Sequence, residues 1–202
     1  MTDDFHPGDV MRLRDLARAG ADRAAGAFGA LVGRDFRPGV PMVRLLPAER
    51  AQEPFVAGAS DAERRDMSGV FFEVEGGPGG VMALFFTPES ANSVLEQLTG
   101  RPAKELDADT VDSALREVGN ILSSHVVSAV ADHIGAVVLP SVPMLATGDA
   151  PAAFASLVAM RALDHPALRI EIEIADGLRE LRSLLVFVPD RIAEAIAPDP
   201  GV

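Results

Sequence analysis

The pattern of apolar and polar positions along the chain changes repeatedly between a helical and an extended period. Apolar residues recur at helical spacing, and glycine closes several of these stretches, as is usual where a helix ends. Six segments are predicted to be helices on this basis: residues 10–32, 61–66, 88–98, 107–134, 150–163 and 189–197. The first contains Gly20, which leaves open whether it is one helix or two helical pieces.

Shorter apolar or alternating stretches lie between turn residues and are predicted to be strands. These are residues 42–46, 70–75, 81–86, 169–174 and 178–188, with a further short extended piece after Pro143. The glycine-rich run 76–80 joins two of them as a hairpin turn, because it lacks the Lys-Ser/Thr of a phosphate-binding loop. The string RIEIEI alternates strictly, which is typical of a half-buried strand.

The order of these elements occurs twice along the chain. Pro143 lies 102 residues after Pro41, and Phe187 lies 101 residues after Phe86. We therefore predict one domain of residues 1–202, made of two copies at about 9–100 and 107–197, with a disordered tail at 198–202. The expected fold is α/β (α+β), with two pseudo-symmetric helix-strand-hairpin-helix repeats that share one sheet flanked by long helices.

Composition narrows the possible partners and compartment. The 202 residues include 18 Lys+Arg and 30 Asp+Glu, a formal net charge of −12, and no cysteine. Nucleic acids and anionic membranes are bound chiefly through clustered Lys and Arg, so neither is expected as a partner. The lack of cysteine excludes disulfides and thiolate chemistry. With neither a secretion signal nor an apolar run near the roughly 20 residues of a spanning helix, we expect a cytoplasmic protein.

The helix predicted over residues 107–134 has two opposite stripes. An apolar stripe faces the core and consists of Val111, Leu115, Val118, Leu122, Val126 and Ala129. The opposite stripe consists of Ser113, Glu117, Asn120, Ser124 and Ser128. A single charge is unusual for an exposed stripe in so acidic a chain. Gly119 costs about 1 kcal/mol relative to Ala inside a helix, which indicates the close approach of another backbone. We expect this surface to dock a partner.

The separations between Ser113, Glu117, Asn120 and Pro143 resemble a known signature. They look like the pattern of the CheC family of chemotaxis phosphatases, whose relatives are CheX and the flagellar switch phosphatase FliY. In that pattern Asp or Ser is followed by Glu, Asn and a distant Pro. The string from Ala114 to Gly135 is similar to the signature helix of the family, and the duplicated order of elements matches its fold from about residue 9 to 197.

The resemblance implies a phosphatase of two-component signalling, acting on the phosphorylated aspartate of a CheY-like response regulator. Asn120 would orient a water for in-line attack, and Glu117 would anchor the helix to a lysine of the regulator. Ser113, Gly119 and Ser124 would contact the partner. The regulator would supply the acyl phosphate and the Mg²⁺, so the chain itself is expected to need no cofactor or metal.

In the first copy, a shift of 102 residues places Asp15 at the Glu117 position and Arg18 at the Asn120 position, while Pro41 matches Pro143. Arginine has no hydrogen-bond acceptor and cannot orient a water as asparagine does. We therefore predict that this first site is inactive and that the protein is a one-site enzyme. The alternative is that Arg18 contributes electrostatically to phosphate binding.

Other functions remain open at this point. CheC proteins also bind the receptor deamidase CheD, so the chain could be a non-catalytic adaptor, or could regulate a response regulator by binding alone. A motor switch component is the third alternative, although proteins of the FliY type carry a further C-terminal motor domain. We expect a monomer, because duplication can satisfy internally the pairing that a single copy would seek in a dimer.

Overall fold

The computed structural model describes residues 7–47, 61–161, 166–178 and 181–192. Its helices are α1 (Pro7–Val32), α2 (Asp61–Asp66), α3 (Pro88–Thr99), α4 (Ala108–Ile134) and α5 (Ala150–Met160), with a short 3₁₀ helix at Ala103–Glu105. Its strands are β1 (Phe36–Pro38), β2 (Met42–Leu46), β3 (Ser68–Glu75), β4 (Gly80–Phe86), β5 (Leu139–Pro140), β6 (Met144–Thr147), β7 (Ala167–Asp176) and β8 (Arg182–Val188). Most predicted elements are present.

The strands found in the described residues form one antiparallel sheet in the order β1-β7-β8-β4-β3-β5. Strand β2 also pairs with β7, and β6 also pairs with β3. The order is symmetric about the central β8–β4 pair, and each half of the chain adds its first two strands to the hairpin of the other half. Two copies sharing one sheet would produce this arrangement. The division into two repeats stays a prediction.

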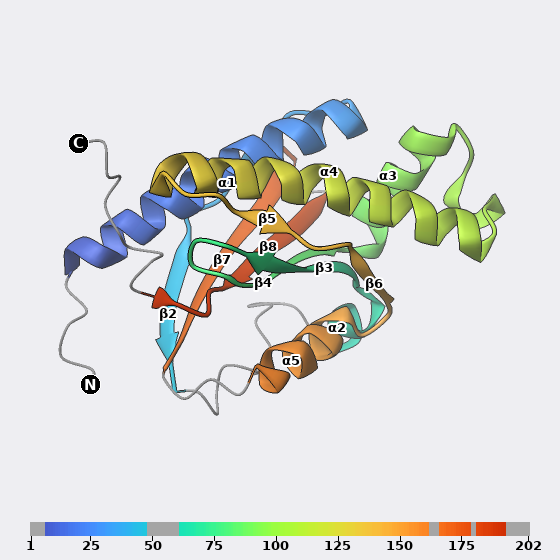
Figure 1. Cartoon of the computed structure of the whole chain (residues 1–202). Helices are drawn as coiled ribbons and strands as arrows, with labels where there is room; N and C mark the ends of the chain where they lie inside the picture. The colour runs from blue at the N-terminus through green and yellow to red at the C-terminus, as the bar shows by residue number, and fades with distance from the viewer. Residues whose placement is uncertain (1–6, 48–60, 162–165, 179–180, 193–202) are drawn as a thin grey trace.

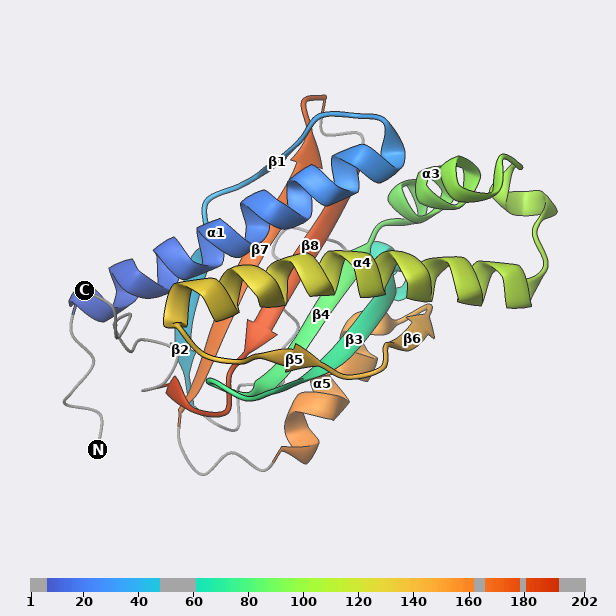
Figure 2. The ribbon, with the colours of Figure 1, turned by 45° about the horizontal axis from the view of Figure 1, so that its top comes forward.

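Helices cover both faces of the sheet (Figure 1). Helices α1 and α4 run antiparallel across one face, with α3 beside them, whereas α2 and α5 lie on the other face (Figure 2). The larger core lies under α1 and α4 and includes Leu16, Leu122 and Ile172. In the smaller core under α5, the rings of Phe71, Phe85 and Phe154 lie with centroids 5.5–5.9 Å apart. The predicted α+β class, with one sheet and long flanking helices, is confirmed.

Local features explain the unbroken course of α1 and the two ends of α4. Helix α1 passes through Gly20 without a break. A Cβ added there would lie 3.3 Å from Val126 Cγ1, so this glycine marks the crossing of α1 and α4 rather than a helix end. Helix α4 is capped by Asp107, whose carboxylate accepts a hydrogen bond from the Thr110 backbone N–H at 2.8 Å. Helix α4 ends at Gly135, which adopts a left-handed conformation.

Strand β7 corrects one prediction. It was expected to be half-buried, yet residues on both of its faces are buried, and its two edges pair with β8 and with β1 and β2. Arg169 and Glu171 are each 2% exposed and form an ion pair, with Arg169 Nε 2.6 Å from Glu171 Oε1. Burial raises the pKa of Glu171, and the Arg169 charge opposes this shift. The charged positions of the alternating string in β7 therefore do not form a solvent-exposed face.

A few predictions fall at the limits of what is described. Helix α5 ends at Met160, and residues 162–163 of its predicted extent lie outside the described residues. The same holds for residues 193–197 of the predicted last helix and for the predicted tail at 198–202. Among the helices that the structure describes, none has the length and apolar character needed to span a membrane.

Candidate functional site

Helix α4 separates into the two predicted stripes. The apolar stripe packs on the sheet, and Leu115, Val118, Leu122, Val126 and Ala129 are all buried. On the opposite side, Ser113, Glu117, Asn120, Ser124 and Ser128 are all exposed. Glu117 and Asn120 are three residues apart, about 4.5 Å along the helix axis, so both side chains leave the same side of the helix. A partner could contact both at once.

The side chains of Glu117 and Asn120 are uncommitted. Within the described part of the chain, neither the Glu117 carboxylate nor the Asn120 side-chain amide forms a hydrogen bond or an ion pair. The Ser124 hydroxyl differs, because it donates to the Asn120 backbone carbonyl at 2.7 Å. Ser124 can therefore offer a partner only its oxygen as an acceptor. The side chains of Glu117 and Asn120, in contrast, keep their full hydrogen-bonding capacity for a partner.

Gly119 does not lie on this exposed surface. It is buried and faces Val70 of β3, where an added Cβ would lie 2.4 Å from Val70 Cγ1 and 2.7 Å from Val70 Cβ. A close approach exists as expected, but it is to the Val70 side chain of the sheet and not to another backbone or to a partner. The placement of Gly119 among the partner-binding residues is therefore corrected: this glycine seats α4 on β3.

Pro143 lies beside helix α4, in the segment between β5 and β6 that runs along the helix (Figure 2). Its carbonyl accepts a hydrogen bond from Arg116 Nη1 at 2.5 Å. Arg116 Nε also donates to Asp112 Oδ2 at 2.6 Å. Sequence reasoning missed both Arg116 and Asp112. The Asp–Arg pair four residues apart on a helix was the signal that could have found them.

The equivalent surface on helix α1 has different chemistry. Asp15 and Arg18 are exposed, as Glu117 and Asn120 are, but Arg18 Nε lies 3.4 Å from Asp22 Oδ2 in an ion pair one turn apart. Pro41 is buried, whereas Pro143 is half-buried. This surface presents an ion pair where α4 presents an uncommitted amide, so it lacks the group proposed to orient a water.

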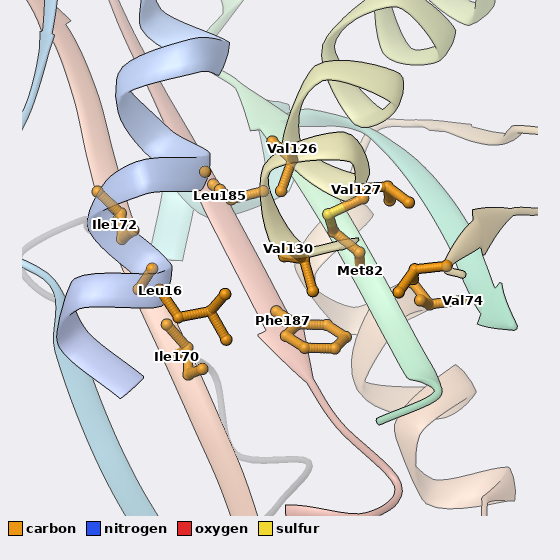
Figure 3. Close-up of a pocket in the computed structure, with 13 residues that line it drawn as sticks. Leu16, Val74, Met82, Val126, Val127, Val130, Ile170, Ile172, Leu185 and Phe187 are labelled. Atoms are coloured by element: carbon orange, nitrogen blue, oxygen red, sulfur yellow. The ribbon is translucent and has the colours of Figure 1, made fainter. Parts of the chain in front are cut away.

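The pocket between α1, α4 and the sheet has no polar side chain in its lining (Figure 3). Leu16 from α1, Val130 from α4 and Phe187 from β8 lie around it, and every residue that lines it is apolar or glycine. Nor do the described residues include a group of three or more His, Asp or Glu side chains placed to hold a metal ion. The exposed face of α4 is thus the surface with chemistry to offer.

Comparisons with known proteins single out the same helix. A family model described as the CheC-like family matches residues 111–145, a range that includes Ser113, Glu117, Asn120 and Pro143. A curated relative, the CheY-P phosphatase CheC of Bacillus subtilis (strain 168), is 27% identical over 185 residues, which cover 88% of this chain and 86% of the relative. The chain is therefore similar to the CheC-like family, both in the matched segment and along most of its length.

Solved structures of CheC-like proteins share the fold. FliY from Thermotoga maritima superposes with a TM-score of 0.64 at 16% identity, covering 95% of this chain and 96% of that one. CheX from Borrelia burgdorferi, in a complex with CheY, BeF₃ and Mg²⁺, has a TM-score of 0.57 at 13% identity, covering 87% and 99%. The FliM middle domain from H. pylori has a TM-score of 0.59 at 15% identity, covering 95% and 98%. These likenesses confirm the CheC-like fold.

Proposed function

We propose that this CheC-like protein removes the phosphoryl group from the aspartyl phosphate of a CheY-like response regulator, with Asn120 orienting the attacking water and Glu117 anchoring the docked regulator. At the level of the family, the relatives connect the chain to chemotaxis and to CheY-P phosphatase activity. The assignment of Glu117 and Asn120 and the choice of regulator are our own inference.

One observation carries the proposal. Glu117 and Asn120 stand one turn apart on the exposed face of α4, uncommitted to any described residue, inside the segment that the CheC-like model matches. Side chains on an ordinary helix surface satisfy one another where they can, as Asp112 and Arg116 do on the same helix. A carboxylate and an amide left open side by side are suited to groups brought by a partner.

The chemistry suits an amide. An aspartyl phosphate is an activated acyl phosphate, and in-line attack by water forms a new P–O bond while the bond to the aspartate oxygen breaks. The aspartate leaves as a carboxylate and inorganic phosphate is released. The Asn120 carbonyl can accept a hydrogen bond from the water while its NH₂ group donates to a phosphoryl oxygen, and neither group titrates near neutral pH. Positioning of this kind contributes about 2.7 kcal/mol if it accelerates hydrolysis about 100-fold.

The phosphoryl group is held on the regulator, and so is its Mg²⁺. A complex of the relative CheX from Borrelia burgdorferi contains CheY, BeF₃ and Mg²⁺ together, which fits a phosphoryl group and a metal ion at the meeting of the two proteins. BeF₃ stands in for a phosphoryl group. Glu117 would then pair with a lysine of the regulator, so its contribution would be to docking rather than to the proton transfers of hydrolysis. An exposed pair of this kind weakens as ionic strength rises.

The decisive experiment follows the decay of a phosphorylated CheY-like regulator with wild-type protein and with Asn120→Ala. We expect Asn120→Ala to return the decay to the spontaneous rate of the regulator, a loss of about 100-fold in kcat for an acceleration of that size. Arg18→Ala, the matched change on α1, should leave the acceleration intact. Glu117→Gln should raise KM more than it lowers kcat. Equal decay rates with wild type and Asn120→Ala would end the catalytic assignment.

A second candidate is regulation by binding alone, through the regulator or through the deamidase CheD. The surface around Asp15 and Arg18 favours binding alone, because Arg18 stands at the position that matches Asn120 and provides no amide. Binding of either protein with no change in the lifetime of the phosphorylated regulator would support this alternative. We also propose that the chain is a monomer, because the two halves of the chain already pair with each other through β2 with β7 and β6 with β3. Sedimentation measures this directly.

A further inference from the structure

We propose that Arg116 is a positioning residue. It clamps the segment Ser141–Met144 against α4, so that Val142 and Met144 form an apolar wall beside Glu117 and Asn120 in the surface that docks the regulator. This inference rests on the proposed function and deepens it by naming a second wall of the same docking surface.

The clamp joins two parts of the chain that are distant in sequence. The Arg116 guanidinium donates from Nη1 to the Pro143 carbonyl at 2.5 Å, from Nε to Asp112 Oδ2 at 2.6 Å, and from Nη2 to Asp112 Oδ1 at 3.4 Å. Asp112 thus holds the planar guanidinium in one orientation by a two-point contact, and Nη1 is left to donate to the loop. Lysine could not reproduce this fork.

Stability does not explain the clamp. The side chains of Arg116 and Asp112 are 40% and 48% exposed, and ion pairs with this exposure contribute little to folding. The loop is also held from the other side, because Ser141 N–H donates to the Glu73 carbonyl at 2.8 Å and Ser141 Oγ accepts from Glu73 N–H at 3.0 Å. What Arg116 adds is a fixed distance between this loop and the turn of α4 that carries Glu117.

The loop presents apolar side chains to solvent. Val142 is 84% exposed and Met144 is 38% exposed, directly on either side of the clamped Pro143. Leu139, at the other end of the same edge, is also exposed. Single exposed apolar side chains are common, but a row of them along one edge beside two uncommitted polar groups is typical of a surface that docks another protein.

The first copy provides an internal comparison. Moving back 102 residues gives Val40, Pro41 and Met42 in place of Val142, Pro143 and Met144, and the two exposed residues there have nearly the same exposure, 83% and 37%. Arg14 matches Arg116, but Val10 stands in place of Asp112. Among the described residues, Arg14 makes no hydrogen bond or ion pair.

The clamp is therefore present only in the copy that retains Glu117 and Asn120. Since Val40 and Met42 have nearly the same exposure as Val142 and Met144 without a clamp, loss of Arg116 is not expected to unfold the loop. We expect it to loosen the loop relative to α4. The consequence is weaker binding of the regulator, with the chemical step little changed.

The choice of a regulator as occupant follows from charge and continuity. The chain carries a net charge of −12, yet Glu117 is the single charged residue in the exposed stripe on α4. A partner with a lysine beside an acidic, metal-loaded phosphorylation site matches Glu117 and Asn120, and the apolar surface around that site would meet Val142 and Met144. Apolar contacts resist salt, so part of the affinity should persist at high ionic strength.

The test combines titration of the BeF₃-activated regulator, steady-state dephosphorylation and thermal unfolding. The variants are Arg116→Met, Arg116→Lys and Val142→Ser, with Arg14→Met and Val40→Ser as matched controls in the first copy. We expect the three variants to weaken binding and raise KM by about 5- to 10-fold, as truncation of a contributing interface residue does, while kcat stays within about twofold and Tm is unchanged. Both controls should match wild type.

The outcomes separate this inference from the proposed function. If wild type accelerates dephosphorylation but Arg116→Met and Val142→Ser keep the wild-type Kd and KM, the docking wall is refuted and the proposed function stands. If the controls weaken binding as much as the test variants, or if Arg116→Met lowers Tm together with kcat, the positioning role is refuted. Wild type that neither binds the regulator nor accelerates its dephosphorylation refutes both.

Discussion

Replacing Gly119 by alanine tests how α4 is seated on the sheet. Gly119 lies next to Asn120 but points the opposite way, into the contact with Val70 of β3. The added Cβ would lie 2.4 Å from Val70 Cγ1, 2.7 Å from Val70 Cβ and 3.0 Å from Val70 Cγ2. Rotation of the valine side chain cannot remove the overlap with its Cβ, which is fixed to the strand. Either the helix or the strand must shift.

The expected cost follows from two opposing contributions. Alanine is better than glycine inside a helix by about 1 kcal/mol. Overpacking a close contact costs about 1–3 kcal/mol. Gly26, an exposed residue of α1 with no atom within 4 Å of an added Cβ, isolates the first contribution. Gly119→Ala should therefore be less stable than Gly26→Ala by about 1–3 kcal/mol, and Gly26→Ala should be slightly more stable than wild type.

Urea and thermal unfolding measure the difference, since 1 kcal/mol corresponds to roughly 2–4 °C in Tm for a chain of this size. A double-mutant cycle with Val70→Ala sharpens the assay. That change removes the contacts at 2.4 Å and 3.0 Å and keeps the one at 2.7 Å, so Gly119→Ala should cost less in the Val70→Ala background. Equal stability of the two glycine variants, or an equal cost in both backgrounds, would refute the seating of α4 on Val70.

Two further predictions concern the elements around the site. Ser90 of α3 is fully buried, and its Oγ donates a hydrogen bond to the Arg182 carbonyl and accepts one from the Arg182 N–H, both at 2.7 Å. Ser90→Ala should therefore lower the free energy of unfolding by about 1–3 kcal/mol. Ser93→Ala on the same helix is the control, and equal effects would contradict the role of Ser90. Asp107 caps α4, and hydrogen bonds from the Thr110 N–H and hydroxyl lower its pKa. Asp107→Ala should therefore lower Tm at neutral pH, and the deficit should shrink as the pH falls below the ordinary carboxyl pKa, because protonation removes the same contribution from wild type. A deficit independent of pH between 7 and 2 would contradict this.

Local signals explain why so much of α4 could be predicted. Its two stripes, its cap at Asp107 and its end at Gly135 depend on residues within a few positions of one another, and all three are present. Strand β1 has three residues and was not predicted, since so short a run carries little periodicity. The burial of Arg169 and Glu171 depends on what packs over that face of β7, and that information is absent from the local pattern.

Two features of the site required the tertiary structure. The orientation of Gly119 was misassigned because the sequence could indicate a close approach but not which surface approaches. The contact between Arg116 and Pro143 spans 27 residues and exists only because β5 and β6 return along α4 to pair with β3. A clamp of this kind depends on sheet order rather than on any motif.

If the chain consists of two copies, as predicted, the sheet order gives a reason to retain a first copy that is inactive. Strand β3 lies in the predicted first copy, yet it supports the exposed surface of α4 on two sides: Val70 contacts α4 at Gly119, and Glu73 holds Ser141 of the clamped loop. Loss of the amide at the Arg18 position leaves both contacts untouched. Selection for activity at Asn120 would therefore preserve the fold of the first copy, including its strands and helix α1, without preserving the chemistry of its surface.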